Sequence, residues 1–203
     1  MAKIAVDIVL LPSEEMMDKA IEANRELLSR RTDKITLNKG DCLPHISLAM
    51  GCIEKTDIAN IEKTLRTVAK NHPPEPLSVV GIRIETNTAD QKISAFEVNK
   101  TERLQSLHEA VMRELVPYFS YHVTANMVLS EPPPDRQTLR WIRDYPQKSS
   151  FENFFPHITI GYGRVAELPS PIKFHATQLA LCHLGNHCTC RKVLASAELS
   201  TQP

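Results

Sequence analysis

Neither sign of charge is in excess in this chain: 24 Lys and Arg residues balance 24 Asp and Glu residues, for a formal net charge of +0. Proteins that hold long nucleic acids through bulk charge carry a basic face, and this composition does not predict one. A small phosphate ligand needs only a few local hydrogen-bond donors, so the charge balance leaves such a ligand open.

The chain also lacks an apolar run long enough to span a membrane. The apolar stretch at residues 3–12 looks at first like a signal peptide, but Asp7 interrupts it and no small-residue cleavage site follows. We therefore expect a first β-strand there.

The five cysteines are an odd number without a secretory signal, which predicts reduced thiols in a cytoplasmic protein. We expect no membrane association, no obligate protein partner and a monomer.

Hydrophobic periodicity predicts strands and helices in an order that lacks regular βαβ alternation, which favours the α+β class over a doubly wound parallel sheet. The length of 203 residues suits one domain or two intimate lobes. Strands are predicted at residues 3–11, 35–37, 43–53, 77–84, 92–98 and 121–129 and, as a pair turning at Gly185-Asn186, within 178–199; helices are predicted at 13–28, 58–69, 101–115 and 137–143, with a turn at 86–90 and a loop at 145–153.

Two octets of the chain are nearly the same, one in each half. They read Pro44-His45-Ile46-Ser47-Leu48-Ala49-Met50-Gly51 and Pro156-His157-Ile158-Thr159-Ile160-Gly161-Tyr162-Gly163. Side chains two apart in a strand share a face, so each octet presents an imidazole and a hydroxyl together. Two such dyads around one small anion would supply an acid, a base and two hydroxyl donors.

The triplet His-x-Ser/Thr is weak evidence by itself. With eight histidines, composition alone predicts about one match, and the chain has five. The other three are His122-Val123-Thr124, His175-Ala176-Thr177 and His187-Cys188-Thr189. Only the octets share a preceding Pro, a following Ile and a Gly six positions after the His, so the shared context selects His45 and His157. The alternative is two half-buried structural histidines.

On these two motifs the chain resembles the 2H phosphoesterase superfamily, which includes 2′-5′ RNA ligase-like proteins and cyclic nucleotide phosphodiesterases. The resemblance implies one domain over residues 1–203, with two pseudo-symmetric lobes that each give one motif strand. Antiparallel sheets would line a central cleft, with helices outside, and no metal or cofactor would be needed. It implies that His45 and His157 are catalytic and that Ser47 and Thr159 bind the substrate.

Phosphodiester hydrolysis needs a base, an acid and donors to the non-bridging oxygens, and histidine suits both proton roles. We therefore expect a metal-independent phosphodiesterase acting on a 2′,3′-cyclic phosphate or on 2′-5′-linked RNA or nucleotide. Which histidine is the acid stays open. Two alternatives also stay open: a non-hydrolytic nucleotide sensor and an RNA 2′-5′ ligase.

Base recognition is less defined in the sequence. Tyr162, Phe154 and Phe155 adjoin the second motif and are candidates for stacking on a base, although Phe154 and Phe155 also suit the core. Arg164 and Lys92 are candidates for phosphate contact.

A rival signal is the cluster Cys182-His183, His187, Cys188 and Cys190, because Cys and His are zinc ligands. Convergence of four ligands would require a broken strand there, so we favour small apolar residues on a sheet.

Overall fold

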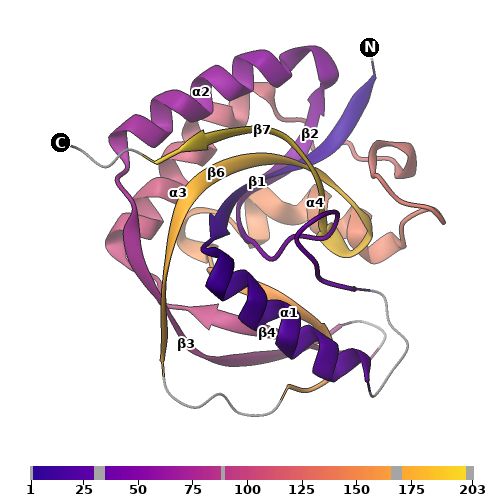
Figure 1. Ribbon diagram of the computed structural model, residues 1–203. Helices are drawn as coiled ribbons and strands as arrows, with labels where there is room; N and C mark the ends of the chain where they lie inside the picture. Colours follow the sequence, from indigo (N-terminus) through magenta and orange to yellow (C-terminus); the bar gives the residue numbers. More distant parts are fainter. Residues whose placement is uncertain (1, 30–34, 88–89, 166–170, 200–203) are drawn as a thin grey trace.

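The computed structural model describes residues 2–29, 35–87, 90–165 and 171–199. Figure 1 shows a sheet with helices on its outside. The strands are β1 (Lys3–Pro12), β2 (Ile46–Glu54), β3 (Glu75–Thr86), β4 (Lys92–Val98), β5 (His157–Tyr162), β6 (Ile172–Leu184) and β7 (Cys190–Glu198); the helices are α1 (Glu14–Leu28), α2 (Ile58–Asn71), α3 (Glu102–Leu115) and α4 (Arg136–Lys148). The predicted α+β class is confirmed.

The seven strands of the described residues form one antiparallel sheet, in the order β2-β1-β6-β3-β4-β5, with β7 also paired to β6. The long strand β6 joins the two halves. Its first part, residues 172–176, pairs with β3, and its later part, residues 178–184, pairs with both β1 and β7. The two motif strands, β2 and β5, therefore end the path, and they contact each other in space.

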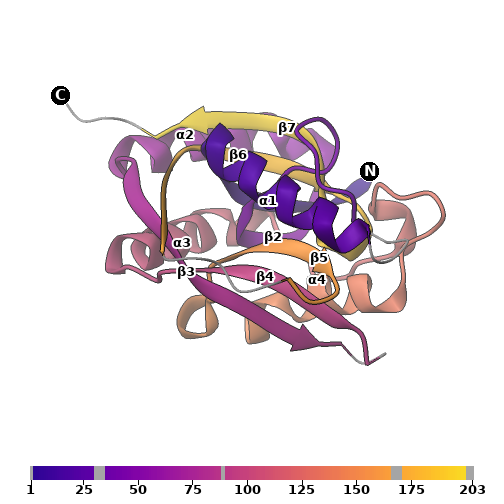
Figure 2. The same cartoon turned by 60° about the horizontal axis from the view of Figure 1, so that its bottom comes forward.

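The helices cover the sheet in a way that crosses between the halves. α2 packs against β6 and β7, α3 and α4 pack against β2, and α1 packs against β5. Figure 2 shows α1, in indigo, lying over β5, although α1 follows β1 directly in the chain. The predicted apolar stripes supply these contacts, since Ile61, Leu65 and Val68 of α2 are all buried.

One buried amide ties α1 to β5. Asn24 is 1% exposed, and its Nδ2 donates to the carbonyls of Ile160 (2.8 Å) and Ile35 (2.9 Å). The amide of Leu37 donates to its Oδ1 (2.9 Å). The predicted strand at residues 35–37 is therefore wrong, because this backbone bonds to a side chain instead of a neighbouring strand. Gly161, at φ +152°, permits the approach, since a Cβ there would lie 3.0 Å from Asn24 Nδ2.

Two further predictions are corrected. Residues 121–129 form no strand. One bridge, between Ser120 and Cys52, precedes them, a short 3-10 helix occupies Ala125–Met127, and the Leu129 amide donates to Leu184 O at their end. The predicted loop at residues 145–153 is helical in part, because α4 runs on to Lys148 and buries Tyr145. The turn predicted at residues 86–90 includes positions 88 and 89, which lie outside the described residues.

A buried histidine of α3 connects the segments that carry the two motifs. The Phe151 amide donates to His108 Nε2 (2.7 Å), so the ring proton lies on Nδ1, which donates to the Leu48 carbonyl of β2 (2.7 Å). The ring stacks on Phe154 at 4.0 Å between centroids. Burial lowers the pKa of His108 to about 4, so the imidazole is neutral at neutral pH.

We expect His108→Ala to lower the free energy of unfolding by at least about 2 kcal/mol, because two buried backbone groups each lose a partner worth roughly 1–3 kcal/mol. Wild-type stability should fall between about pH 6.5 and pH 4, where the unfolded chain binds a proton that the folded His108 does not. The variant should lose this part of the pH dependence.

Urea denaturation at pH 7 and pH 5 measures both effects. The matched control is His122→Ala, because His122 is exposed, and it should change stability by less than about 0.5 kcal/mol. Equal stability of His108→Ala and the control would contradict the connecting role.

Candidate active site

The first dyad lies at the start of β2. Ile46 and Leu48 are fully buried, whereas His45 and Ser47 between them are partly exposed. The alternation places the imidazole and the hydroxyl on one face and the aliphatic side chains in the core, as the pattern predicts.

The second dyad repeats this arrangement in β5. His157 and Thr159 are partly exposed, and Ile158 and Ile160 are fully buried. The two motif strands also share an irregularity. The pairing of β1 with β2 shifts just after Ser47, and the pairing of β4 with β5 shifts just after Thr159. Each dyad is thus followed by a β-bulge, a device that often re-aims side chains near functional sites.

Both imidazoles are held in the same way. His45 Nδ1 lies 2.7 Å from the carbonyl oxygen of Leu43, and His157 Nδ1 lies 2.8 Å from that of Phe155, in each case two residues before the histidine. A carbonyl only accepts, so Nδ1 carries the proton and donates. Nε2 of each ring is therefore the nitrogen available to take or give a proton to a substrate.

The two histidines act on one another electrostatically. Burial lowers the pKa of His45 to about 4, the hydrogen bond to Leu43 opposes this, and the charge of a protonated His157 lowers it further. The His45 side chain is only 12% exposed, which explains why burial dominates. His45 is thus a neutral imidazole at neutral pH, with an Nε2 lone pair, beside a second histidine on the contacting strand.

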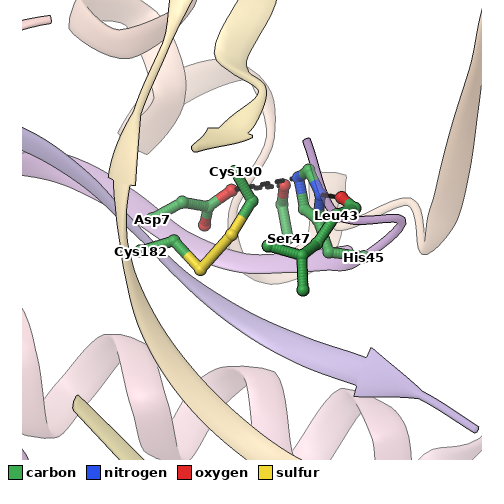
Figure 3. The surroundings of a disulfide bond; sticks show 6 residues. All are labelled: Asp7, Leu43, His45, Ser47, Cys182 and Cys190. Atoms are coloured by element: carbon green, nitrogen blue, oxygen red, sulfur yellow. Dashed lines mark hydrogen bonds and ion pairs between the residues drawn. A yellow bond between two sulfur atoms is a disulfide. The ribbon is translucent and has the colours of Figure 1, made fainter. Parts of the chain in front are cut away.

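A carboxyl group that the sequence analysis did not assign to the site lies behind the first dyad. Asp7 of β1 is fully buried, and its Oδ2 lies 2.6 Å from Ser47 Oγ and 3.8 Å from His45 Nε2. Figure 3 shows the three side chains together. The sequence feature that could have indicated this role is Asp7 itself, because it is a single charged residue in an apolar strand, and an acid buried there needs a partner.

Figure 3 also shows a disulfide between Cys182 of β6 and Cys190 of β7, with the Cα atoms 5.5 Å apart. The prediction of reduced thiols is wrong for this pair, because the β6–β7 pairing brings the two residues within bridging distance. The zinc alternative needs thiolates, and two of its candidate ligands are bonded to each other. The carbonyl of Cys190 accepts from the Leu43 amide (3.1 Å), so the bridge lies beside the residue that orients His45.

The structure separates the three aromatic candidates. Tyr162 is buried, with its hydroxyl 3.2 Å from His187 Nδ1, so its ring is turned away from solvent. Phe154 is buried in the core. Phe155 is partly exposed beside His157, with 5.8 Å between ring centroids, and the Arg83 guanidinium lies 4.1 Å from its centroid.

The two candidates for phosphate contact differ in their surroundings. Arg164 is exposed, and Lys92 Nζ donates to Thr86 Oγ1 (2.6 Å). His122 of the third triplet is exposed on a segment without a strand. A cavity of about 350 Å³ against Leu10 and Leu77 includes no motif residue.

The fold and the site together define an α+β protein with two histidine–hydroxyl dyads on the terminal strands of one sheet. The family model of the 2′-5′ RNA ligase superfamily matches residues 38–183, a range that includes both dyads. The chain therefore belongs to the 2′-5′ RNA ligase superfamily, and the resemblance noted in the sequence is confirmed.

Solved structures of the same fold extend over nearly the whole chain. TT0787 of Thermus thermophilus is 14% identical, with 97% of this chain and 98% of that chain covered and a TM-score of 0.62. Apo LigT of E. coli is 13% identical, with 99% and 100% covered and a TM-score of 0.52. LigT complexed with NADP+ is 14% identical, with 99% and 100% covered and a TM-score of 0.51. These likenesses concern the fold.

A comparison with curated proteins finds no significant sequence match. Within the described ranges, no helix is both long enough and apolar enough to cross a membrane.

We expect the His45 ring to titrate with a pKa of about 4 in the folded protein, because its burial opposes the charged form. Ring ¹⁵N chemical shifts followed by NMR between pH 3 and pH 8 measure this value. The internal control is the same resonance in the urea-unfolded chain, which should return to about 6.5. A folded-state pKa near that ordinary value would show that the ring is solvated and would contradict the site geometry.

Proposed function

We propose that the chain is a metal-independent phosphodiesterase that hydrolyses a 2′,3′-cyclic phosphate or a 2′-5′-linked RNA or nucleotide by two-histidine acid–base catalysis. The observation that carries the proposal is the matched fixing of the two imidazoles. Each Nδ1 donates to the carbonyl two residues before it, on strands that contact each other, and each Nε2 is left for proton transfer.

We assign the role of the base to His45 and that of the acid to His157. A general base must be neutral before the reaction, and the lowered pKa of His45 keeps it so. His45 Nε2 takes a proton from water as the water oxygen bonds to phosphorus. The ring P–O bond of a cyclic phosphate breaks, and His157 Nε2 gives its proton to the departing oxygen. One imidazole is positively charged at each stage, His157 before the proton transfers and His45 after them.

We assign the two hydroxyls to the non-bridging oxygens. Ser47 and Thr159 each share a face with the histidine two residues earlier. A hydroxyl donor aimed at a developing negative charge is worth up to about 10²–10³-fold in rate. Tyr162 touches His187 instead of facing solvent, so we propose that any effect on substrate binding passes through that contact.

We also propose that residues 1–203 are one domain built from two pseudo-symmetric lobes. The support is the repeated register of the dyads. Ser47 pairs with Val9 and Thr159 with Ala95, and in both cases the register shifts at the next residue. A repeat of strand pairing around both dyads is the expected result of a duplicated unit.

A nucleotide or an RNA end is the substrate class that the chemistry favours. E. coli LigT, which shares the fold, has been solved with NADP+. In this chain the partly exposed Phe155 ring lies beside His157, and a base that stacks on the face covered by Arg83 would have to displace that guanidinium. Cytoplasmic location and a monomeric state stay predictions.

Replacing either histidine tests the acid–base pair. His45→Ala and His157→Ala should each lower kcat by about 10²–10⁴-fold, because each removes a positioned proton-transfer group. The matched control is His122→Ala, which removes the histidine of an exposed copy of the same triplet and should leave kcat unchanged. Turnover of either dyad variant at the control's level would refute the mechanism.

A substrate panel tests the reaction class. Purified protein should hydrolyse at least one member of a set comprising nucleoside 2′,3′-cyclic phosphates, RNA with 2′,3′-cyclic ends and 2′-5′-linked dinucleotides. The product should be a single phosphate isomer, and EDTA should leave the rate unchanged. Tight nucleotide binding without turnover across the panel would favour the sensor instead, and joining of RNA ends would favour the ligase.

A further inference from the structure

Asp7 differs from every other residue near the dyads, because it is an acid with no exposed surface. Its Oδ2 lies 2.6 Å from Ser47 Oγ, and its Oδ1 has no hydrogen-bond partner among the described residues. At that distance, either of the two oxygens can be the hydrogen-bond donor. The serine can donate to a carboxylate, or a carboxylic acid can donate to the serine.

Among the residues that the structure describes, the matching place at the second dyad holds no acid. Ser47 faces Val9 across β1, and Asp7 lies two residues before Val9. Thr159 faces Ala95 across β4, and the residue two before Ala95 is Ile93. The same place in the strand pairing thus holds a carboxyl group in one half and an aliphatic side chain in the other. The core does not require an acid here, so a role at the first dyad explains its presence.

Burial of Asp7 outweighs the contacts that would stabilise a negative charge on it. Among the described residues, His45 is the only basic group within 4.0 Å of its carboxylate, at 3.8 Å from Nε2, and burial lowers the pKa of His45 to about 4. The other titratable groups that interact with it are Tyr145 of α4 and Cys188 of the short helix Asn186–Cys188, and burial raises the pKa of both. Burial likewise raises the pKa of Asp7 well above its ordinary value, against smaller opposing effects of the Ser47 hydroxyl and the Ala49 backbone.

We propose that Asp7 is a positioning residue that carries a proton at neutral pH and donates it to Ser47 Oγ, so that the Ser47 hydroxyl donates in turn to a phosphate oxygen. This inference rests on the proposed function, because it assigns a task to the Ser47 hydroxyl at that site. Asp7 Oδ2–H donates to Ser47 Oγ, and Ser47 Oγ–H donates to the ligand.

The direction of these two hydrogen bonds matters when the ligand is an anion. An ionised Asp7 would hold the Ser47 proton and leave only serine lone pairs facing the phosphate, which would repel it. It would also add a negative charge close to the substrate and favour a protonated His45, which cannot act as a base. A neutral Asp7 removes all three obstacles and keeps His45 ready to accept a proton.

Two variants test whether Asp7 acts as a hydrogen-bond donor or as a negative charge. Asp7→Asn keeps the shape and supplies an N–H to Ser47 Oγ, so kcat/KM should stay within about threefold of wild type, with an unchanged acidic limb of the pH profile. Asp7→Leu has the same branching and no donor, so kcat/KM should fall by about 10–10²-fold, less than or equal to the loss in Ser47→Ala. In the Ser47→Ala background, Asp7→Leu should add no further loss, because it acts through Ser47.

Infrared spectroscopy tests the proton without any substrate. Wild-type protein at pH 7 should show the C=O stretch of a buried protonated carboxyl, and Asp7→Asn should lack it. Binding of inorganic phosphate, measured by calorimetry, should weaken in Asp7→Leu and Ser47→Ala and be retained in Asp7→Asn.

Absence of the infrared band overturns the inference, as does an Asp7→Asn variant that loses as much activity as Asp7→Leu or shifts the acidic limb. If Asp7→Leu does not fold, the band and the pH profile of Asp7→Asn still decide the question. Failure of the proposed function gives a different result, in which wild-type protein neither binds phosphate nor turns over any panel substrate. In that case the infrared band still shows whether Asp7 is protonated.

Discussion

The pairing of one long strand with both halves of the sheet is the constraint on which the site depends. β6 spans 13 residues, bonds to β3 along its first part and bonds to β1 and β7 along the rest. Because the strand is continuous, β2 and β5 become the two ends of a single sheet. The natural twist of that sheet then allows its terminal strands to approach, and β2 contacts β5.

Within that frame, short-range hydrogen bonds prepare the histidines. Each ring is fixed by a carbonyl two residues away, a contact that the local backbone provides without help from the other half. The difference between the rings is not local. His45 lies near the buried Asp7 and the Cys182–Cys190 bridge, whereas the place that matches Asp7 in the second half holds Ile93. A similar pair of motifs thereby becomes chemically asymmetric, which acid–base catalysis requires.

The errors of sequence interpretation share a cause. Residues 35–37 have strand-like composition, but the buried amide of Asn24 satisfies their backbone groups. Residues 121–129 also look like a strand, but Ala125–Met127 form a short helix that contacts β1, and the Leu129 amide donates to Leu184 O. Asp7 looks like an interruption of an apolar run, and its carboxyl group contacts Ser47. In each case the segment contacts residues distant in the chain, and periodicity does not report such partners.

The sequence alone determined the α+β class, most of the helices and strands and the two dyads, because strand alternation and helical spacing are local properties of the backbone. The shared frame around His45 and His157 also sufficed to indicate the superfamily. Only the tertiary structure decided that the two motif strands contact each other, that burial keeps His45 neutral and that Asp7 lies behind Ser47. Those facts depend on the pairing of β6 with three other strands and on the removal of side chains from water, and both arise only when the whole sheet has formed.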